Sequence, residues 1–297
     1  MWLKSVTILL ILHWTEVHGN KSSIIDNHPS WKCLPKDTCG MTRFDVAKGR
    51  IIGGEKAALG QFPWMVRIGF ARFTLMEPEF FCAGSLISTT HVLTAGHCGT
   101  KNNMVRVGEN NVETNPDCEG NVCAPRPQDI RIKLYLIDIY DSETSQDDIN
   151  MILLAKHVKL NDFVVPICLP YGGLLKRNMM GKHMTIAGWG YTSSSSENQS
   201  KDLMHVAEPV VNQTLCNDIY KHNLTSKQYC IGYPEGKDTC NGDSGGPAMK
   251  SMKVNDGRRM FLFGIVSYGL VDCGNGPAVY TAVVKYMKII LDKIQCQ

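Results

Sequence analysis

The chain has 297 residues, of which 43% are hydrophobic and 20% charged, and its formal net charge is +3. A chain of this length and composition can bury a substantial core, which argues against disorder as the default state. Residues 51–297 carry 24 basic and 24 acidic residues. This balance argues against a nucleic-acid-binding protein and against a protein that binds anionic membranes.

Residues 1–19 have the pattern of a secretory signal peptide. Lys4 precedes an apolar run from Val6 to Trp14, and the small residue Gly19 follows. A membrane anchor is the alternative, but the run is too short to span a bilayer and no other candidate span occurs. We therefore expect a secreted, extracellular protein, cleaved near Gly19.

Residues 20–50 are polar and are interrupted by Pro29, Pro35 and Gly40. This pattern favours a tethered extension over a folded module. The composition changes at "KGRIIGGEKA", where a basic stretch meets the first apolar residues of the main domain. We expect one large domain to follow, over residues 51–297.

Short apolar or alternating runs separated by turn residues then follow along the chain. Such runs favour an all-β sandwich or barrel. They cover residues 62–70, 80–88, 91–96, 104–108, 130–137, 149–154, 183–190, 205–211, 228–233, 260–269 and 278–284.

Two loop-like insertions and one helix complete the predicted elements. Residues 111–128 could be closed by a local Cys118–Cys123 bridge, and residues 190–202 are rich in serine. Only the end of the chain is predicted to be helical. There Val284, Met287, Leu291 and Ile294 recur at helical spacing, which indicates a stripe facing the core.

The chain contains twelve cysteines. In a secreted protein they indicate a disulfide framework, and their spacing with histidine is not that of a zinc site. Asn-x-Ser/Thr sequences make four asparagines candidate glycan acceptors, namely Asn20, Asn198, Asn212 and Asn223.

Three separate stretches carry side chains suited to nucleophilic catalysis. Ser244 lies in "CNGDSGGPAM", and a serine hydroxyl needs a base that takes its proton. His97, in "VLTAGHC", follows a strand-like run, and Asp147 and Asp148 precede another. Each feature alone is more often structural than catalytic.

Together, "TAGHC", "DINMILL" and "GDSGGP" resemble the trypsin/chymotrypsin family of serine proteases over residues 51–297. The resemblance implies two six-stranded antiparallel β-barrels with a C-terminal helix. It also implies that Ser244 is the nucleophile, His97 the general base and then the general acid, and Asp148 the group that orients the imidazole. Asp148 is preferred to Asp147 because the family pattern places the acid directly before Ile149. Asp147 is then interpreted as a solvated loop charge.

The resemblance assigns further roles around the nucleophile. The backbone N–H groups of Gly242 and Ser244 would form the oxyanion hole. Cleavage between Arg50 and Ile51 would free an amino terminus that pairs with Asp243, so the secreted chain would be a zymogen and residues 20–50 its propeptide or light segment.

Substrate binding is also implied by the resemblance. Asp238 would lie at the base of the primary pocket and pair with Arg or Lys, while Ser267 and Gly269 would lie on the substrate-binding strand. Ala278 replaces the usual glycine and would place an extra methyl group near the pocket, which would either shift the Arg/Lys ratio or weaken catalysis without abolishing it. Other departures, at Gly96, Asn150, Met151 and Tyr268, remove no reacting group.

Four disulfides follow from the resemblance: Cys82–Cys98, Cys216–Cys230, Cys240–Cys273 and Cys39–Cys168. With Cys118–Cys123 assigned locally, Cys33 and Cys296 are left, and they pair either with each other or with another chain. The loop and the "CG" linker look most like arthropod clip-type and venom proteases. Residues 20–50 hold only two cysteines, too few for a clip module.

No cofactor is expected to be required, although Glu109 resembles a calcium ligand and is otherwise an exposed loop acid. The expected partners are protein substrates cut after Arg or Lys, an activating protease and a protein inhibitor. A catalytically silent homologue that acts as a binding partner is the alternative. An esterase of the α/β-hydrolase type would need a G-x-S-x-G elbow and alternating helices, and neither occurs.

Overall fold

The computed structural model describes residues 21–44, 54–72, 77–191, 199–233, 243–270 and 276–296. Several predicted features lie outside these residues. They are the signal peptide, the Arg50–Ile51 bond, Asp238, Cys240, Gly242, Cys273, Asn20 and Asn198.

The secondary structure of the described residues is mostly β. Its strands are β1 (Glu55–Lys56), β2 (Met65–Phe70), β3 (Glu79–Leu86), β4 (His91–Thr94), β5 (Met104–Val107), β6 (Cys118–Glu119), β7 (Val122–Cys123), β8 (Gln128–Asp138), β9 (Asn150–Leu154), β10 (His183–Gly188), β11 (Met204–Val211), β12 (Gln228–Ile231), β13 (Pro247–Val254), β14 (Gly257–Tyr268) and β15 (Ala278–Ala282). Its α-helices are α2 (Lys21–Asp26), α3 (Gln213–Tyr220) and α4 (Met287–Lys293), and its 3-10 helices are η1 (Pro29–Cys33), η2 (Gly96–Cys98), η3 (Gly172–Lys176) and η4 (Val283–Lys285).

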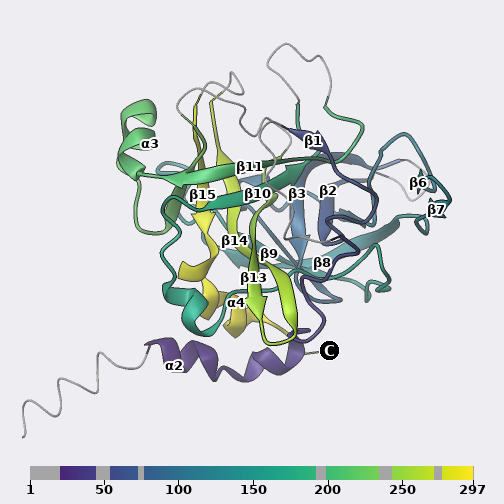
Figure 1. Cartoon of the computed structure of the whole chain (residues 1–297), viewed down its shortest axis with the longest axis horizontal. Coiled ribbons are helices and arrows are strands. Elements are labelled where there is room, and N and C mark those ends of the chain that lie inside the picture. The colour runs from purple at the N-terminus through teal and green to yellow at the C-terminus, as the bar shows by residue number, and fades with distance from the viewer. Residues whose placement is uncertain are drawn as a thin grey trace, which may run out of the picture.

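The strands form two antiparallel barrels that stand side by side (Figure 1). The first closes in the order β2-β3-β4-β9-β8-β5. The second runs β11-β10-β13-β14-β15-β12 and closes because β11 also pairs with β12, while β1 adds to the outer edge of β11. The prediction of two six-stranded antiparallel barrels with a C-terminal helix is therefore confirmed.

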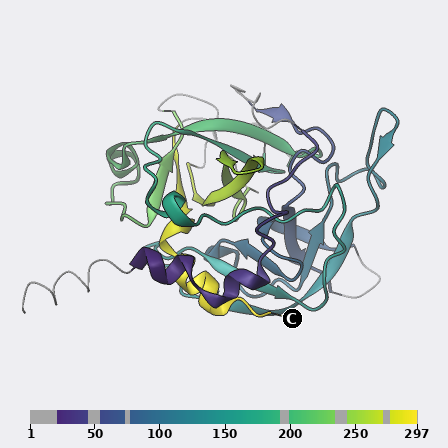
Figure 2. The same cartoon turned by 60° about the horizontal axis from the view of Figure 1, so that its bottom comes forward.

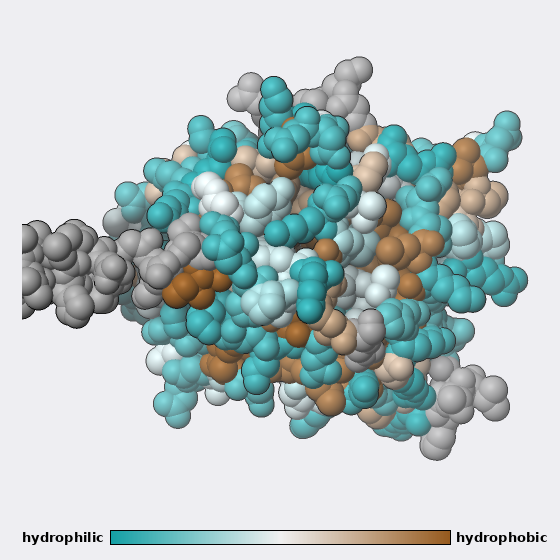
Figure 3. Space-filling view, turned by 90° about the horizontal axis from the view of Figure 1, so that it is seen from below, coloured by the Kyte–Doolittle hydropathy of each residue, from teal (hydrophilic) through white to brown (hydrophobic). Residues whose placement is uncertain are grey.

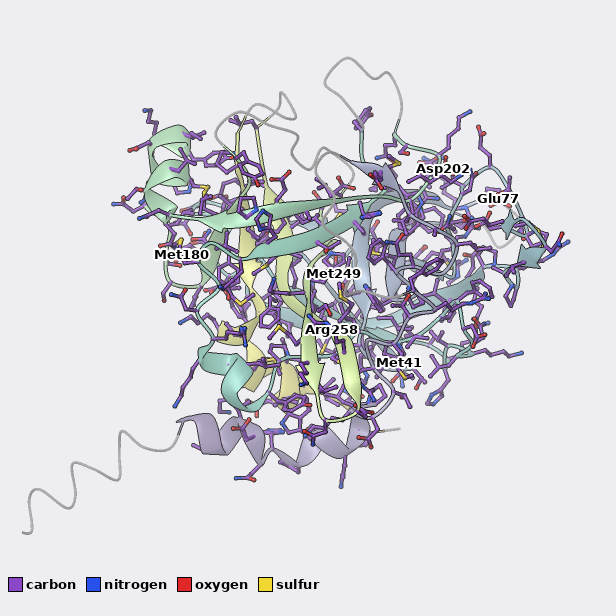
Figure 4. All side chains as sticks on the ribbon, viewed as in Figure 1. Met41, Glu77, Met180, Asp202, Met249 and Arg258 are labelled. Carbon is purple, nitrogen blue, oxygen red and sulfur yellow. A yellow bond between two sulfur atoms is a disulfide. The ribbon has the colours of Figure 1, made fainter. Side chains whose placement is uncertain are left out.

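The barrels meet at a buried interface near the centre of the molecule. Met249, labelled in Figure 4, lies there on β13, and the Trp64 indole Nε1 is 3.2 Å from its sulfur. Both side chains are fully buried. A second link is a backbone hydrogen bond from Ala83 N on β3 to Ser244 O, 2.8 Å long. Because these contacts join residues far apart in sequence, each barrel helps to fix the other.

The segment of residues 21–44 packs against the domain and is not loosely tethered. Trp31 is only 7% exposed, and its ring lies 5.9 Å from that of Tyr171. Disulfides join Cys33 to Cys296 and Cys39 to Cys168. The sequence showed no apolar period here because two large buried side chains, Trp31 and Leu34, and two disulfides hold the segment, in place of an amphipathic stripe.

Helices α2 and α4 consequently lie side by side at the bottom of the molecule, where the two ends of the described chain meet (Figures 1 and 2). Asp26 Oδ1 accepts a 2.7 Å hydrogen bond from Gly172 N, and His28 Nε2 lies 3.1 Å from Asp292 Oδ1. Seen from below, this face is mostly hydrophilic with small separate hydrophobic patches (Figure 3).

All eleven predicted runs contain a strand, but four strands, β1, β6, β7 and β13, were not predicted, and the expectation that only the end of the chain is helical was wrong. β13 was not predicted, because "PAMKSMKV" contains Met and Lys where strands favour β-branched residues. Helix is not confined to the end of the chain: α3 begins after Asn212, whose side chain accepts a hydrogen bond from Thr214 N. In α4, Met287, Leu291 and the following Ile294 are buried as predicted, and Ile290 joins them.

Within the part of the chain that the structure describes, no helix has both the length and the apolar character needed to cross a bilayer.

The buried His91 connects β4 to the C-terminal end of the chain. Its Nε2 accepts a 3.3 Å hydrogen bond from Gln295 N, so the ring proton is on Nδ1, which lies 2.9 Å from Ser88 Oγ. Burial lowers the pKa of His91 to about 4. The folded protein therefore keeps this ring neutral at a pH where the unfolded chain protonates it.

This difference in pKa predicts acid sensitivity. Between pH 6.5 and pH 4 the unfolded state binds more protons at His91 than the folded state does. As the pH is lowered through this range, His91 therefore decreases the free energy of unfolding by up to about 3 kcal/mol. His91→Gln should show a smaller loss of stability over this range in urea unfolding at fixed pH steps. His157→Gln, which changes an exposed histidine bonded to Thr89, is the matched control. An equal loss in His91→Gln and wild type would contradict the prediction.

Candidate active site

The first half of the site is a histidine on η2, directly after β4. His97 Nδ1 donates to Asp148 Oδ2 at 2.8 Å, and His97 N donates to Asp148 Oδ1 at 2.8 Å. The Cys82–Cys98 disulfide ties η2 to β3. A Cβ at Gly96 would lie 2.5 Å from the Tyr140 Cβ, so glycine at this position permits the close approach of Tyr140. The imidazole is thus held by both its ring and its backbone.

Asp148 is the most enclosed acid of the site, at 2% exposed. Besides His97, its Oδ2 accepts a 2.5 Å hydrogen bond from Ser267 Oγ, and its carbonyl accepts one of 2.6 Å from Thr281 Oγ1. Burial acts to raise the pKa of Asp148, but the hydrogen bonds and charge of its partners outweigh it, so the pKa lies below its usual value. The residue is therefore an ionised, buried carboxylate.

Ser244 lies in a tight turn between the barrels. Gly246 N donates to Asp243 O at 2.8 Å, and Gly245 has φ +81°. A Cβ at Gly245 would lie 2.2 Å from Thr94 Oγ1 and 2.4 Å from Ala83 O, so no side chain fits there. This packing presses the turn against β3 and β4 and leaves the Ser244 side chain partly exposed.

His97, Asp148 and Ser244 line one cleft of about 320 Å³. Among the contacts of the described residues, Ser244 Oγ makes no hydrogen bond to the His97 ring. Such bonds are often long before substrate binds and close only in the complex. Tyr140 and Ser145 also line the cleft, on the side of the first barrel.

Asp243, beside the nucleophile, is buried at 8% exposure. Its Oδ1 accepts a 2.8 Å hydrogen bond from Gly190 N. A Cβ at Gly188 would lie 1.9 Å from Oδ1, and one at Gly190 would lie 2.6 Å from Oδ2. The sequence reading missed these two glycines, although their repeat in "AGWG" after a strand was a usable signal.

The other side of the cleft is the end of β14 and the residues after it, Ser267, Tyr268, Gly269 and Leu270. Gly269 is exposed to the cleft and adds no side chain. Ser267 makes a contact that sequence reasoning did not predict, since its hydroxyl reaches Asp148. Ala278 begins β15 and is 1% exposed, with its side chain in the core of the second barrel.

Five disulfides occur among the described residues. Four join the pairs expected from sequence: Cys39–Cys168, Cys82–Cys98, Cys118–Cys123 and Cys216–Cys230. The fifth joins Cys33 to Cys296, which is one of the two alternatives left open for these residues. His97, Cys82 and Cys98 are close enough to suggest a metal site, but both cysteines are disulfide-bonded. Asn212 and Asn223 are both exposed.

The interpretation of Asp147 as a solvated charge does not match its contacts. Its Oδ1 lies 2.5 Å from Lys227 Nζ and 2.8 Å from Tyr286 OH. Both partners belong to the second barrel and the residues that follow it, whereas Asp147 lies between β8 and β9 of the first. The local sequence around Asp147 could not reveal these contacts, because Lys227 and Tyr286 are 80 and 139 positions away in the chain.

Glu109 is buried, not exposed, at 7% of its surface. Its Oε1 has no hydrogen-bond partner among the described residues, and Oε2 accepts a 3.4 Å hydrogen bond from Arg106. Burial and the neighbouring Asp117 carboxylate raise the pKa of Glu109 to about 6, against the opposing charges of Arg106 and Arg67. The Glu109 Oε1 atom is therefore open to a cation, whereas both Asp117 carboxylate oxygens already accept hydrogen bonds from residues of the same loop.

Comparison with known proteins gives one consistent result. The sequence profile of the Trypsin family matches residues 51–290. The chain is 35% identical to the CLIP domain-containing serine protease HP8 of Bombyx mori, over 94% of this chain and 75% of that protein. It is 37% identical to the venom serine protease Bi-VSP of Bombus ignitus, over 84% and 69%.

Two further matches come from Drosophila. The Spaetzle-processing enzyme of Drosophila melanogaster is 34% identical, over 87% of this chain and 69% of that protein. The crystal structure of the Grass clip serine protease of the Toll pathway superimposes with a TM-score of 0.75 at 29% identity, covering 93% of this chain and 78% of the other.

The buried Glu109 carboxylate yields a prediction about proton binding. The pKa of Glu109 is about 6 in the folded state and 4.5 for the free side chain, so the folded protein binds this proton more tightly than the unfolded chain does. As pH falls from 7.5 to 4.5 in the presence of EDTA, wild type should therefore gain up to about 2 kcal/mol of stability relative to Glu109→Gln. Urea unfolding of both proteins measures this difference. Glu113→Gln, an exposed acid of the same loop paired with Lys201, should show no such change.

Proposed function

The chain belongs to the trypsin family and is a trypsin-like serine endopeptidase, and from this premise we propose that it is a secreted zymogen. Cleavage between Arg50 and Ile51 would activate it. The active form would then hydrolyse protein substrates after Arg or Lys, through an acyl-enzyme.

The observation that carries the proposal is the buried pair of His97 and Asp148, which faces the same cleft as Ser244. Because the Asp148 carboxylate can only accept, the proton between the two residues is on His97 Nδ1, and Nε2 is left with a free electron pair toward the cleft. This tautomer is the one that a general base needs.

The reaction follows from these positions. His97 Nε2 takes the proton of Ser244 Oγ as that oxygen bonds to the substrate carbonyl carbon, and Asp148 stabilises the imidazolium that forms. The imidazolium then gives the proton to the leaving amine as the peptide bond breaks. A water molecule repeats both steps on the ester, which frees the acid product and restores Ser244.

Activation would act through Asp243. The new amino group of Ile51 would pair with this carboxylate, which is buried against two glycines and bonded to Gly190 N. A buried charge is stabilised strongly by an opposite charge, so pairing would fix the turn that contains Gly242 and Ser244. Their N–H groups would then face the developing oxyanion.

Specificity would come from Asp238, six positions before Ser244, with Ser267 and Gly269 on the strand that pairs with extended substrate. Ala278 is not proposed as a specificity residue, because its side chain lies in the core of the second barrel at the start of β15. The proposed cleavage after basic residues therefore depends on the Asp238 carboxylate.

The relatives support a role in an arthropod proteolytic cascade or a venom, since one is named a Spaetzle-processing enzyme, another a phenoloxidase-activating factor and a third a venom protease. Such a role implies an activating protease upstream and a protein inhibitor. The exposed Asn212 and Asn223 would carry glycans.

No cofactor is proposed for catalysis. We propose that Glu109 is a ligand of a structural calcium ion, in the loop that also contains Asp117. At pH 7.5, calcium should then raise the unfolding temperature of wild type but not of Glu109→Gln.

Activation and nucleophile identity can be tested together. Cleaved wild type should react with a fluorophosphonate probe at Ser244. Arg50→Gln should remain uncleaved when it is treated with a trypsin-like activator. Because its oxyanion site is not formed, this variant should react with the probe at least about 100 times more slowly. Mass spectrometry locates the labelled residue.

Ser244→Ala, cleaved in the same way, is the matched control and should take up no probe. If the protein is a catalytically silent homologue, cleaved wild type will also remain unlabelled. Rapid labelling of intact Arg50→Gln would refute the zymogen proposal alone.

The specificity proposal predicts the residue before each cut. Proteome-derived peptides digested by the activated enzyme should show Arg or Lys at that position, and Asp238→Ser should lower kcat/KM for such substrates by at least about 100-fold, since a buried cation loses its partner. Aromatic or small residues before the cut would overturn the assignment of Asp238.

A further inference from the structure

Asp147, next to the active-site carboxylate, joins the first barrel to the second. Its Oδ1 accepts from Tyr286 OH at 2.8 Å and lies 2.5 Å from Lys227 Nζ. Its side chain is 27% exposed, so the contact is partly shielded from water. The residue stands in the left-handed region at φ +53°, which aspartate tolerates better than most residues.

The partners of Asp147 are themselves fixed. Tyr286 is 4% exposed, and it connects η4 to α4 because its N–H donates to Val283 O and its carbonyl accepts from Ile290 N. Lys227 is anchored through its carbonyl, which accepts from Ala282 N at the end of β15. The Lys227 ammonium also lies 5.7 Å from the centre of the Tyr286 ring. A buried phenol and the half-exposed ammonium of a lysine whose backbone is anchored therefore hold one carboxylate.

Asp147 and Asp148 share a peptide bond, so a restraint on one acts on the other. Ile149 N donates to Asp147 O at 2.8 Å, which closes a three-residue turn around Asp148. Thr281 Oγ1 holds the Asp148 carbonyl on the other side of that turn. The backbone of Asp148 is thus fixed at both ends by the second barrel, although it belongs to a loop of the first.

We propose that Asp147 is a positioning residue, clamped by Tyr286 and Lys227, that fixes the direction in which Asp148 points at His97. This inference rests on the proposed function of the same site. The Asp147 carboxylate touches no reacting group, so it acts through the geometry of its neighbour. The Lys227 ammonium balances the second negative charge that this arrangement brings beside the buried carboxylate.

If the clamp acts through hydrogen bonds, replacing the Asp147 carboxylate by an amide should preserve it, whereas removing the side chain should not. Asp147→Asn keeps an oxygen that can accept from Tyr286 OH, whereas Asp147→Ala keeps none. We expect Asp147→Ala to lower kcat by about tenfold with KM unchanged within about twofold, and Asp147→Asn to keep at least about half of the wild-type kcat. Tyr286→Phe should lie between the two.

A double variant tests whether the two residues act together. If they form one clamp, Asp147→Ala combined with Tyr286→Phe should be no slower than Asp147→Ala alone, within about twofold. Asp138→Ala, an exposed acid at the end of β8, is the matched control and should leave kcat unchanged. Kinetics are measured on activated enzyme whose active sites are counted by fluorophosphonate titration.

A purely structural role would lower stability without changing the chemistry of the imidazole. The proposal therefore requires a shift of about half a pH unit toward lower pH in the acid limb of kcat/KM for Asp147→Ala, because the imidazolium loses a well-aligned carboxylate. It also requires the low-field NMR resonance of the His97 Nδ1 proton to move, and this signal needs no turnover.

The outcomes separate the two proposals. If cleaved wild type takes up no probe but the His97 resonance moves in Asp147→Ala, the proposed function fails and the clamp stands. If wild type is active and Asp147→Ala keeps its kcat, pH profile and resonance, the clamp is refuted. Equal losses of kcat in Asp147→Asn and Asp147→Ala would also refute it, since charge alone would then explain the effect.

Discussion

The structure depends on the burial of one ionised carboxylate between two barrels. Asp148 comes from a loop of the first barrel, yet the hydroxyl groups that bond to it belong to the second: Ser267 donates to its carboxylate and Thr281 to its backbone carbonyl. Ser244 comes from the second barrel, yet its carbonyl is bonded to Ala83 of the first. Each barrel therefore holds the active group of the other, and an unpaired Asp148 would be costly enough to oppose their separation.

Close approach of backbones makes this exchange possible. At Gly245, Gly96 and Gly188, any added Cβ would meet a neighbour within 2.5 Å. These residues lie beside the three groups that matter most: the nucleophile, the histidine and the acid that would receive the new amino terminus. Of the three, Gly245 determines how near the two barrels can come, because its neighbours Thr94 and Ala83 belong to the first barrel. Gly96 and Gly188 instead admit Tyr140 and Asp243, each within its own barrel.

Apolar patterning predicted a strand in each of the eleven runs, and the motifs in their fixed order predicted the fold class, the barrels and the residues that share the cleft. It did not predict β13 or α3, whose residues have weak local preferences. It also misjudged Asp147, Glu109 and residues 21–44. In each of these cases the environment is made by partners far away in the chain, and no local pattern of charge or hydrophobicity records them.

The two disulfides that attach residues 21–44 to the protease domain would keep this segment bound to the enzyme after activation. Cys39 is bonded to Cys168, and Cys33 to Cys296, next to the C-terminal helix. A cut after Arg50 would create a second chain but release nothing. The mature enzyme would diffuse as one body, and any molecule that recognises residues 21–44 would stay attached to the protease and determine where it acts.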